Sequence, residues 1–245
     1  MPLGQYSGRF QIESAAKHYD DFVYAQQSHD SYLGLIEAEI LVRVVRQLTG
    51  RGGVRYMDFA CGTGRILSML APHTEVAVGI DVSPVMVERA STRVAGATTR
   101  VQDVRVNPTV AEGPFDLITA FRFFLNVDPA LREPYLSALA RNLRSRESLL
   151  LFNVHGNRHS VRHVAAAYRK SGPEQFNEMS RSECLELLNR AGLEVVEWWG
   201  VGVLPRTLYK PGIAPAVAEL DRVMFASGLF RKVSQNLIFA CRRAA

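Results

Sequence analysis

The sequence predicts an α/β fold in which a parallel sheet carries helices on both faces. From residue 54 onward, short apolar runs typical of strands alternate with amphipathic runs typical of helices. This alternation is typical of strand–helix–strand units joined by right-handed crossovers. A glycine-rich turn directly after the first apolar run supports the same architecture. The length of 245 residues and the hydrophobic content of 47% suit one domain with a full core.

The expected elements follow one another in a regular order. Residues 11–49 have helical periodicity, which the sequence "TGRGG" ends. We expect strands at residues 54–60, 75–81, 97–103, 115–121, 148–156, 193–200 and 234–242. We expect helices between them at residues 64–71, 83–94, 134–145 and 180–192, with Ser83 as N-cap before Pro84 and Gly192 as C-cap. Two insertions remain, at about residues 156–180 and 200–234.

Composition argues against several classes of protein. No run of 18 apolar residues is present, so we expect no membrane span, and the first ten residues lack the apolar core of a signal peptide. The three cysteines fit neither a disulfide framework nor a zinc site, so we expect no metal and a reducing, cytoplasmic setting. The net charge of +5 comes from dispersed Lys and Arg residues, which favours a mixed surface over a nucleic-acid footprint.

The turn in "MDFACGTGRI", residues 57–66, carries the functional signal. Gly62 and Gly64 would let a ligand approach the backbone after the first strand. A dinucleotide-binding turn would have a third glycine where Leu67 stands, and a phosphate loop would have Gly-Lys-Ser/Thr, which is absent. The turn therefore supports close backbone approach without an obvious pyrophosphate cradle.

Three acidic residues narrow the choice of ligand. Asp81 ends the second expected strand, where a carboxylate can accept hydrogen bonds from both ribose hydroxyls. Asp103 ends the third and can accept from an adenine amine, and Asp58 precedes the turn, where it can orient the turn or meet a ligand ammonium. Together they suit a nucleoside with a cationic amino-acid tail. Two structural alternatives remain open, in which Asp81 caps a turn and Asp103 is a solvated loop residue.

The segments "DFACGTGR", "GIDVSPVMVERA", "VQDV" and "FDLITAFRFFLN" resemble the ordered motifs of class I S-adenosylmethionine-dependent methyltransferases. The resemblance covers roughly residues 50–200 and the last strand. It implies a Rossmann-like sheet of seven strands, the last antiparallel and inserted between the fifth and the sixth. It also implies S-adenosylmethionine as cofactor, bound by Tyr19, Asp58, Ala60, Gly62, Gly64, Asp81, Val82, Met86, Asp103, Val104 and Phe121. At position 60 the family usually has glycine, and we expect the turn to survive with alanine because its side chain is small.

The acceptor side of the site is less constrained. Arg122 follows the fourth strand and could hold a carboxylate or phosphate, or be a surface charge. His155 follows the fifth strand and could act as a general base near neutral pH, or bond the backbone as a loop histidine. Asn/Asp-Pro-Pro-Tyr and Pro-Cys motifs typical of nucleic-acid methylation are absent after the fourth strand.

Two further segments could cover the ligands. In this family an N-terminal segment with aromatic residues closes over the cofactor, which by resemblance gives Tyr19 a cofactor contact and Tyr24 a substrate contact; ordinary helix packing is the alternative. The insertion at residues 200–234 leaves from the ligand-bearing end of a parallel strand and returns to it, so we interpret it as a substrate lid with Arg206 as a binding residue. An extra surface helix without a ligand is the alternative.

We therefore expect one domain over residues 1–245, with a helical cap at 1–50, a cofactor-binding core at 51–155 and the lid. The expected activity is O- or N-methylation of a small molecule, such as a natural product or a sugar or lipid intermediate, without a nucleic-acid partner. An RNA or protein methyltransferase is the first alternative and would need a continuous basic groove. A non-catalytic cofactor-binding module is the second, and an NAD-dependent enzyme, disfavoured by Leu67, is the third.

Overall fold

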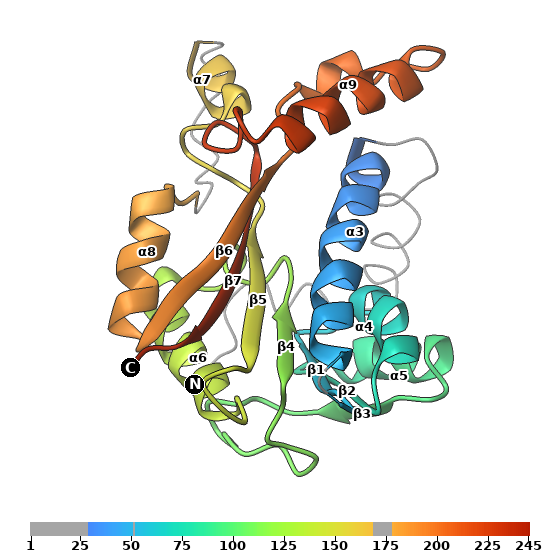
Figure 1. Ribbon diagram of the computed structural model, residues 1–245, viewed down its shortest axis with the longest axis vertical. Helices are drawn as coiled ribbons and strands as arrows, with labels where there is room; N and C mark the ends of the chain where they lie inside the picture. The colour runs from blue at the N-terminus through green and yellow to red at the C-terminus, as the bar shows by residue number, and fades with distance from the viewer. Residues whose placement is uncertain (1–28, 51, 169–177) are drawn as a thin grey trace.

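A computed structural model describes residues 29–50, 52–168 and 178–245. Seven strands in this part of the chain form one sheet in the order β3-β2-β1-β4-β5-β7-β6 (Figure 1). They span Arg55–Phe59 (β1), Val76–Asp81 (β2), Thr98–Val101 (β3), Leu117–Ala120 (β4), Leu149–Val154 (β5), Leu193–Val201 (β6) and Asn236–Arg243 (β7).

The pairing of β7 decides the topology of the sheet. β7 is antiparallel to both β5 and β6, whereas β1, β2, β3, β4 and β5 pair in parallel. The predicted Rossmann-like sheet, with an antiparallel last strand between the fifth and the sixth, is confirmed. Because the parallel strands end at the same edge, the loops after β1, β2, β4 and β5 meet there.

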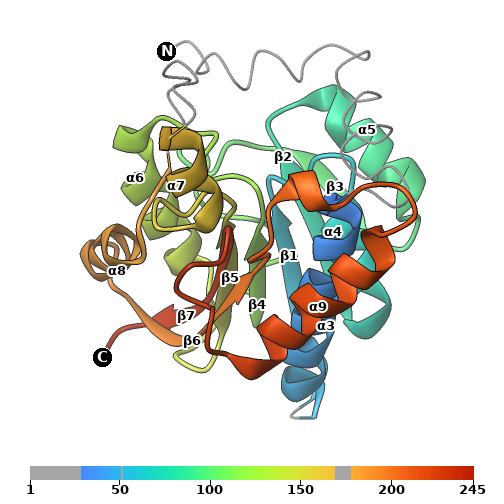
Figure 2. The ribbon, with the colours of Figure 1, turned by 90° about the horizontal axis from the view of Figure 1, so that it is seen from above.

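Helices cover both faces of the sheet (Figure 2). One face packs against α3 (His29–Thr49) and α4 (Arg65–Leu70), which is followed by the short 3-10 helix η2 (Ala71–His73); α5 (Pro84–Arg93) lies beside β2 and β3. The other face packs against α6 (Pro129–Arg141) and α8 (Arg181–Arg190). The two cores use alternate strand residues: Tyr56 contributes to the first and Met57 to the second.

Helix α6 begins five residues earlier than the sequence pattern predicted, at Pro129 instead of Pro134. The side chain of Asp128 accepts a hydrogen bond from the backbone N–H of Ala130, which caps the helix, and Pro129 occupies the first helical turn. Pro134 therefore lies inside the helix. The expected start at Ser83 is confirmed, because Ser83 caps α5. At the end of α8 the C-cap is Ala191 instead of the expected Gly192, which follows it with a φ of 71°.

Both insertions contain helices. The first contains α7 (Val161–Tyr168) and the second contains the 3-10 helix η3 (Arg206–Leu208) and α9 (Ala214–Ser227). In Figure 2, α9 lies across α3 on the side of the sheet edge where the parallel strands end. The part of the first expected helix within the described residues is α3, and residues 11–28 lie outside them. Among the described helices, none has the length and apolarity needed to cross a bilayer.

Candidate active site

The turn between β1 and α4 has the backbone geometry that its glycines allow. Gly62 has a φ of 54° and donates its N–H to Asp81 Oδ2 at 2.9 Å. Gly64 has a φ of 82°, and a Cβ atom there would lie 3.2 Å from the Cα and Cβ atoms of Ala90 in α5. Gly62 therefore ties the turn to the end of β2, whereas Gly64 lets α4 start close to α5.

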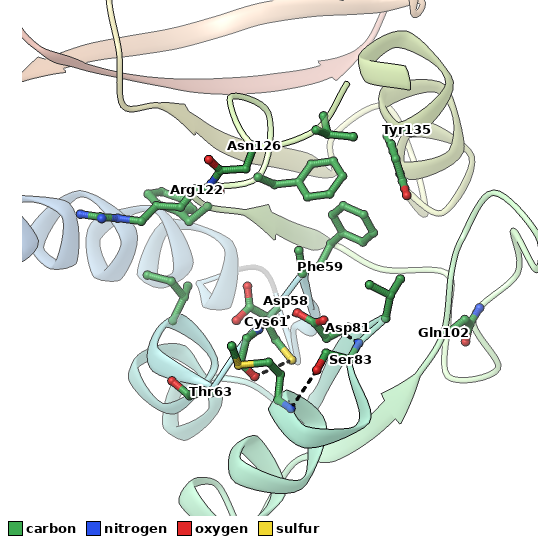
Figure 3. A pocket seen from close by; sticks show the side chains of 18 of the residues that line it. Asp58, Phe59, Cys61, Thr63, Asp81, Ser83, Gln102, Arg122, Asn126 and Tyr135 are labelled. Carbon is green, nitrogen blue, oxygen red and sulfur yellow. Dashed lines mark hydrogen bonds between the residues drawn. The ribbon is translucent and has the colours of Figure 1, made fainter. Parts of the chain in front are cut away.

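A cavity of about 190 Å³ opens at the ends of β1, β2 and β4, beside this turn (Figure 3). Eight of the residues assigned to ligand binding from the sequence line it: Asp58, Ala60, Gly62, Asp81, Val82, Met86, Phe121 and Arg122. Gly64, Asp103, Val104, His155 and Arg206 are not among the lining residues within the described part of the chain. Tyr19 and Tyr24 lie outside the described residues.

Asp58 is a buried carboxyl group at the wall of the cavity. Its Oδ1 accepts a hydrogen bond from the Thr119 hydroxyl at 2.7 Å, and that hydroxyl also lies 2.7 Å from the Tyr56 hydroxyl. Its Oδ2 is buried and has no hydrogen-bond partner among the described residues. Burial raises the pKa of Asp58 to about 7, although the Thr119 hydroxyl and the charge of Arg65 oppose the rise. A cationic group in the cavity would favour the ionised form.

The sequence left two roles open for Asp81, as the cap of a turn or as a ligand-binding residue. In the structure Asp81 both accepts hydrogen bonds from backbone N–H groups and lines the cavity. Its Oδ1 accepts the Ser83 N–H and its Oδ2 accepts the Gly62 N–H, each at 2.9 Å. Burial raises the pKa of Asp81, and these backbone bonds oppose the rise. A carboxylate has about four lone-pair sites, so both oxygens can still accept ligand hydroxyls from the cavity.

The third acidic residue is placed differently. Asp103 pairs with Arg105: the Nη2–Oδ2 distance is 2.7 Å, and the Arg105 backbone N–H donates to Oδ1 at 2.9 Å. These bonds hold the pKa of Asp103 below its usual value despite partial burial. The side chains that reach the cavity here are Gln102 and Arg105, and Val104 is buried away from it. The structure therefore gives Asp103 an ion pair in place of a contact with the cavity.

An aromatic wall closes the cavity on the side of α6. Phe59 and Phe123 pack edge to face with ring centroids 4.7 Å apart, and Phe123 meets Tyr135 in the same way at 4.7 Å. Arg105 lies over the Tyr135 ring, with its Cζ atom 4.8 Å from the centroid. Flat apolar surfaces of this kind can stack with a planar base or a hydrophobic ligand.

Two residues of the cavity have strained backbones. Ala60 has a φ of 53° and Arg122 a φ of 56°, and no other non-glycine residue among those described has a positive φ. The left-handed conformation costs an L-residue roughly 1–2 kcal/mol, and such outliers cluster at functional sites. At position 60 the prediction that alanine is compatible with the turn is confirmed, at the cost of this strain.

His155 lies after β5 and beside Arg122, but its environment differs from the expected one. Burial lowers the pKa of His155 to about 4, and the charge of Arg122 lowers it further. The expectation of a histidine that titrates near neutral pH is therefore wrong. Its Nδ1 is buried and has no hydrogen-bond partner among the described residues.

Asp30, at the start of the described part of α3, faces the same region. Its Oδ1 lies 3.6 Å from Arg122 Nη2 and 3.6 Å from His29 Nδ1. Burial alone would raise the pKa of Asp30, but the contact with His29 and the charges of Arg122 and Arg206 hold it below its usual value. Arg206, which begins η3 in the insertion at residues 200–234, therefore acts on this carboxylate electrostatically, as Arg122 does.

Comparison with known proteins gives a family for the core. Residues 57–146 match the model of a family described as a methyltransferase domain. A protein of Geobacillus sp. (strain WCH70), provisionally named a methyltransferase, is 26% identical over 148 residues. That match covers 58% of this chain, which spans 57% of the length of that relative.

Solved structures share the whole fold. Magnesium protoporphyrin IX methyltransferase from Synechocystis PCC 6803, with bound S-adenosylhomocysteine, has a TM-score of 0.65 at 14% identity, over 98% of this chain and 100% of that one. N-methyltransferase NodS from Bradyrhizobium japonicum WM9, with the same ligand, has a TM-score of 0.62 at 15% identity, over 96% and 98%. The chain therefore has the fold of these methyltransferases, and its residues 57–146 match the methyltransferase-domain model.

Some residues around the cavity were not predicted from the sequence. Phe59, Phe123 and Tyr135 form its aromatic wall, and Arg105 and Asn126 also line it. The run "FRFF" after β4 was a visible signal for the wall, whereas Tyr135 was assigned only to a helix. His29 and Asp30 gave no signal, because their proximity to Arg122 depends on how α3 packs on the sheet. Within the described residues, no group of three or more His, Cys, Asp or Glu side chains is placed to hold a metal ion.

Proposed function

We propose that the protein transfers a methyl group from S-adenosylmethionine to a small-molecule acceptor. One observation carries the proposal: a turn with left-handed backbone at Ala60 and Gly62 lies in one cavity with the buried carboxyl groups of Asp58 and Asp81. The family match over residues 57–146 supports it, because this segment contains the turn and both acidic residues. The ligands in the two similar structures also support it.

The residues of the cavity fit this cofactor. The free lone pairs of Asp81 suit two ribose hydroxyls, and the unpartnered Oδ2 of Asp58 suits a cationic amino group. Val82, Met86 and Phe121 supply apolar surface for the adenine, and the aromatic wall adds flat surface beside it. We retain Gly64 as a packing residue of the site, and Tyr19 stays a prediction. Asp103 would need to leave Arg105 to contact an adenine amine.

When bound, the cofactor supplies the activated methyl group, so the chain mainly positions the acceptor and excludes water. Such positioning can account for roughly 7–11 kcal/mol of a barrier. We place the acceptor on the Arg122 side, under η3 and α9, with Arg206 and Tyr24 as further contacts. His155 is neutral at pH 7 and has a free buried Nδ1, so it can accept a proton from a hydroxyl acceptor. A base with a pKa of about 4 is weak, so we expect it to contribute less than a histidine near 7 would.

Calorimetry with S-adenosylhomocysteine tests the cofactor site. Asp81→Ala removes the acceptor of both ribose bonds, each worth roughly 1.5–3 kcal/mol before compensation, so we expect a loss of affinity of at least tenfold. Asp116→Ala is a matched control. Asp116 is a partly exposed aspartate just before β4, at the end of that strand far from the cavity. We therefore expect this variant to bind S-adenosylhomocysteine as well as wild type does. Wild-type protein that binds no S-adenosylhomocysteine would remove the proposal. Binding without transfer to any small molecule would favour a non-catalytic module or a macromolecular acceptor.

A further inference from the structure

Arg122 is held in its left-handed backbone by two asparagine side chains. Its N–H donates to Asn153 Oδ1 at 2.6 Å, and its carbonyl oxygen accepts from Asn126 Nδ2 at 2.5 Å. Asn153 lies in β5 and is completely buried. Since an arginine does not favour a φ of 56°, these contacts are what the fold supplies to keep residue 122 in this conformation.

The amide of Asn153 belongs to a longer chain of buried hydrogen bonds. Asn153 Nδ2 donates to Asn236 Oδ1 at 3.2 Å, and Asn236 Nδ2 donates to Glu37 Oε1 at 2.6 Å. The other oxygen of Glu37 lies 3.3 Å from Arg65 Nη2. Asn236 and Glu37 are also buried, in β7 and α3. The chain therefore runs from Arg122 on one side of the cavity to Arg65 on the other, and both arginines line it.

The two ends of this chain determine the orientation of both amides. A backbone N–H can only donate, and an ionised glutamate can only accept. With Arg122 N–H at one end and Glu37 at the other, each asparagine must accept on the side of Arg122 and donate on the side of Glu37. The carboxylate of Glu37 therefore keeps the carbonyl oxygen of Asn153 directed at Arg122.

Arg122 lies at the wall of the cavity, near the carboxylate of Asp30. Arg122 and Arg206 both lower the pKa of Asp30, and Arg162 also acts on His155. The distance of 3.6 Å between Arg122 and Asp30 is longer than a hydrogen bond. An acidic group of a ligand in the cavity would meet the guanidinium of Arg122, which lines it.

We propose that Asn153 is a positioning residue for the acceptor: it holds residue 122 in the left-handed backbone that lets the Arg122 guanidinium bind an acidic group of the acceptor. The proposal rests on the proposed function and deepens it, because it gives the acceptor a carboxylate or a phosphate. Asn153 touches neither ligand and acts through Arg122. Asn236 and Glu37 fix the orientation of the Asn153 amide. Glu37 also holds Arg65, so the same buried chain supports the cofactor side of the cavity.

The test compares two buried asparagines. Asn153→Ala removes the contact to Arg122. Asn142→Ala removes another buried amide, which donates to the carbonyl oxygens of Pro108 and Ala138 beyond the other end of β4. We expect similar falls in melting temperature, since each variant leaves buried polar groups unpaired. The discriminating readout is the affinity of the S-adenosylhomocysteine complex for two probes, inorganic phosphate and benzoate, measured by titration.

Asn153→Ala should weaken the binding of at least one probe about tenfold, while the affinity for S-adenosylhomocysteine changes less than twofold. Asn142→Ala should change neither. In an Arg122→Ala background, adding Asn153→Ala should cause no further loss of probe binding, because the two residues act as a unit. A preference for phosphate or for benzoate identifies the acidic group. If Asn153→Ala does not fold, Asn153→Ser, which keeps a shorter hydrogen-bonding group, should give a smaller loss in the same direction.

The proposal is overturned if Asn153→Ala binds both probes as well as wild type does. It is equally overturned if both asparagine variants lose the same affinity for S-adenosylhomocysteine as for the probes. It is also overturned if the wild-type complex binds neither probe. Failure of the proposed function looks different, because S-adenosylhomocysteine itself would then not bind to the wild-type protein.

Discussion

At the scale of single residues, Asp58 makes stability depend on pH. Its pKa is about 7 in the folded protein, against about 3.9 in an unfolded chain. Between these pH values the folded state holds a proton that the unfolded state has lost, so stability falls as the pH rises from about 4 to 7, by at most about 1.4 kcal/mol per pH unit. We expect Asp58→Asn to remove this component. Between pH 4 and 8, the melting temperature of the variant should rise relative to that of wild type. A difference in melting temperature that does not change with pH would contradict the buried protonated state.

The strain at Ala60 gives a second prediction. Ala60→Gly should stabilise the protein by about 0.5–1 kcal/mol, since relief of a left-handed alanine outweighs the greater freedom of glycine in the unfolded chain. Ala130→Gly, at an exposed position in the first turn of α6, should destabilise it by up to about 1 kcal/mol. Urea unfolding of the two variants measures both effects. If both variants lower the free energy of unfolding, position 60 is not strained.

His155 should remain neutral through the physiological range. Burial and the neighbouring Arg122 lower its pKa to about 4, so its imidazole resonances should not shift between pH 5.5 and 8. Nuclear magnetic resonance can follow them, with His155→Gln to assign the signals. A titration near 6.5 would restore the histidine that the sequence predicted and would imply that bound solvent or ligand reaches the ring.

At the scale of elements, a buried carboxylate ties together the insertion at residues 200–234, which we interpret as a lid. Asp221 in α9 accepts the Val203 N–H at 2.8 Å and the Tyr209 hydroxyl at 2.6 Å, so it joins α9 to the residues that follow β6 and η3. Asp221→Ala should cost about 1–3 kcal/mol, because it leaves buried donors unpaired, whereas Glu219→Ala on the exposed face should change stability by less than about 0.5 kcal/mol. If the lid covers the acceptor, phosphate or benzoate binding should weaken more than S-adenosylhomocysteine binding. Equal losses would indicate a structural helix.

Local signals in the sequence were enough for most elements and insufficient for contacts between them. Strand periodicity, the glycine turn and the cap at Ser83 act over a few residues, and the structure has those elements. The start of α6 was misjudged because Pro134 looked like a helix start, although Asp128 and Pro129 are the stronger signal. Asp103 was assigned to the cofactor from its place at the end of the third strand, and its ion pair with Arg105, two residues away, was not predicted.

At the scale of the whole molecule, the topology was predictable only through resemblance. Alternation of strands and helices predicts parallel pairing, but nothing local in residues 234–242 shows that β7 inserts between β5 and β6. That insertion brings Asn236 next to Asn153, and the packing of α3 brings Glu37 to both. The buried chain behind Arg122 therefore joins residues up to 199 positions apart in the sequence, beyond the reach of any periodicity.

The stability of the whole fold should respond to one adenosine-containing ligand and not to another. A ligand that binds only the folded state stabilises it by RT ln(1 + [L]/Kd), about 2.7 kcal/mol at a hundredfold excess over Kd. For a chain of 245 residues this corresponds to a rise in melting temperature of roughly 5–10 °C. We expect S-adenosylhomocysteine to produce such a rise and NAD at the same concentration to produce none, because Leu67 stands where a dinucleotide turn needs glycine. In Asp81→Ala the rise should shrink, since weaker binding lowers [L]/Kd. A rise with NAD alone would mean that the turn binds a pyrophosphate despite Leu67, and it would replace the methyltransferase assignment with that of a dinucleotide-dependent enzyme.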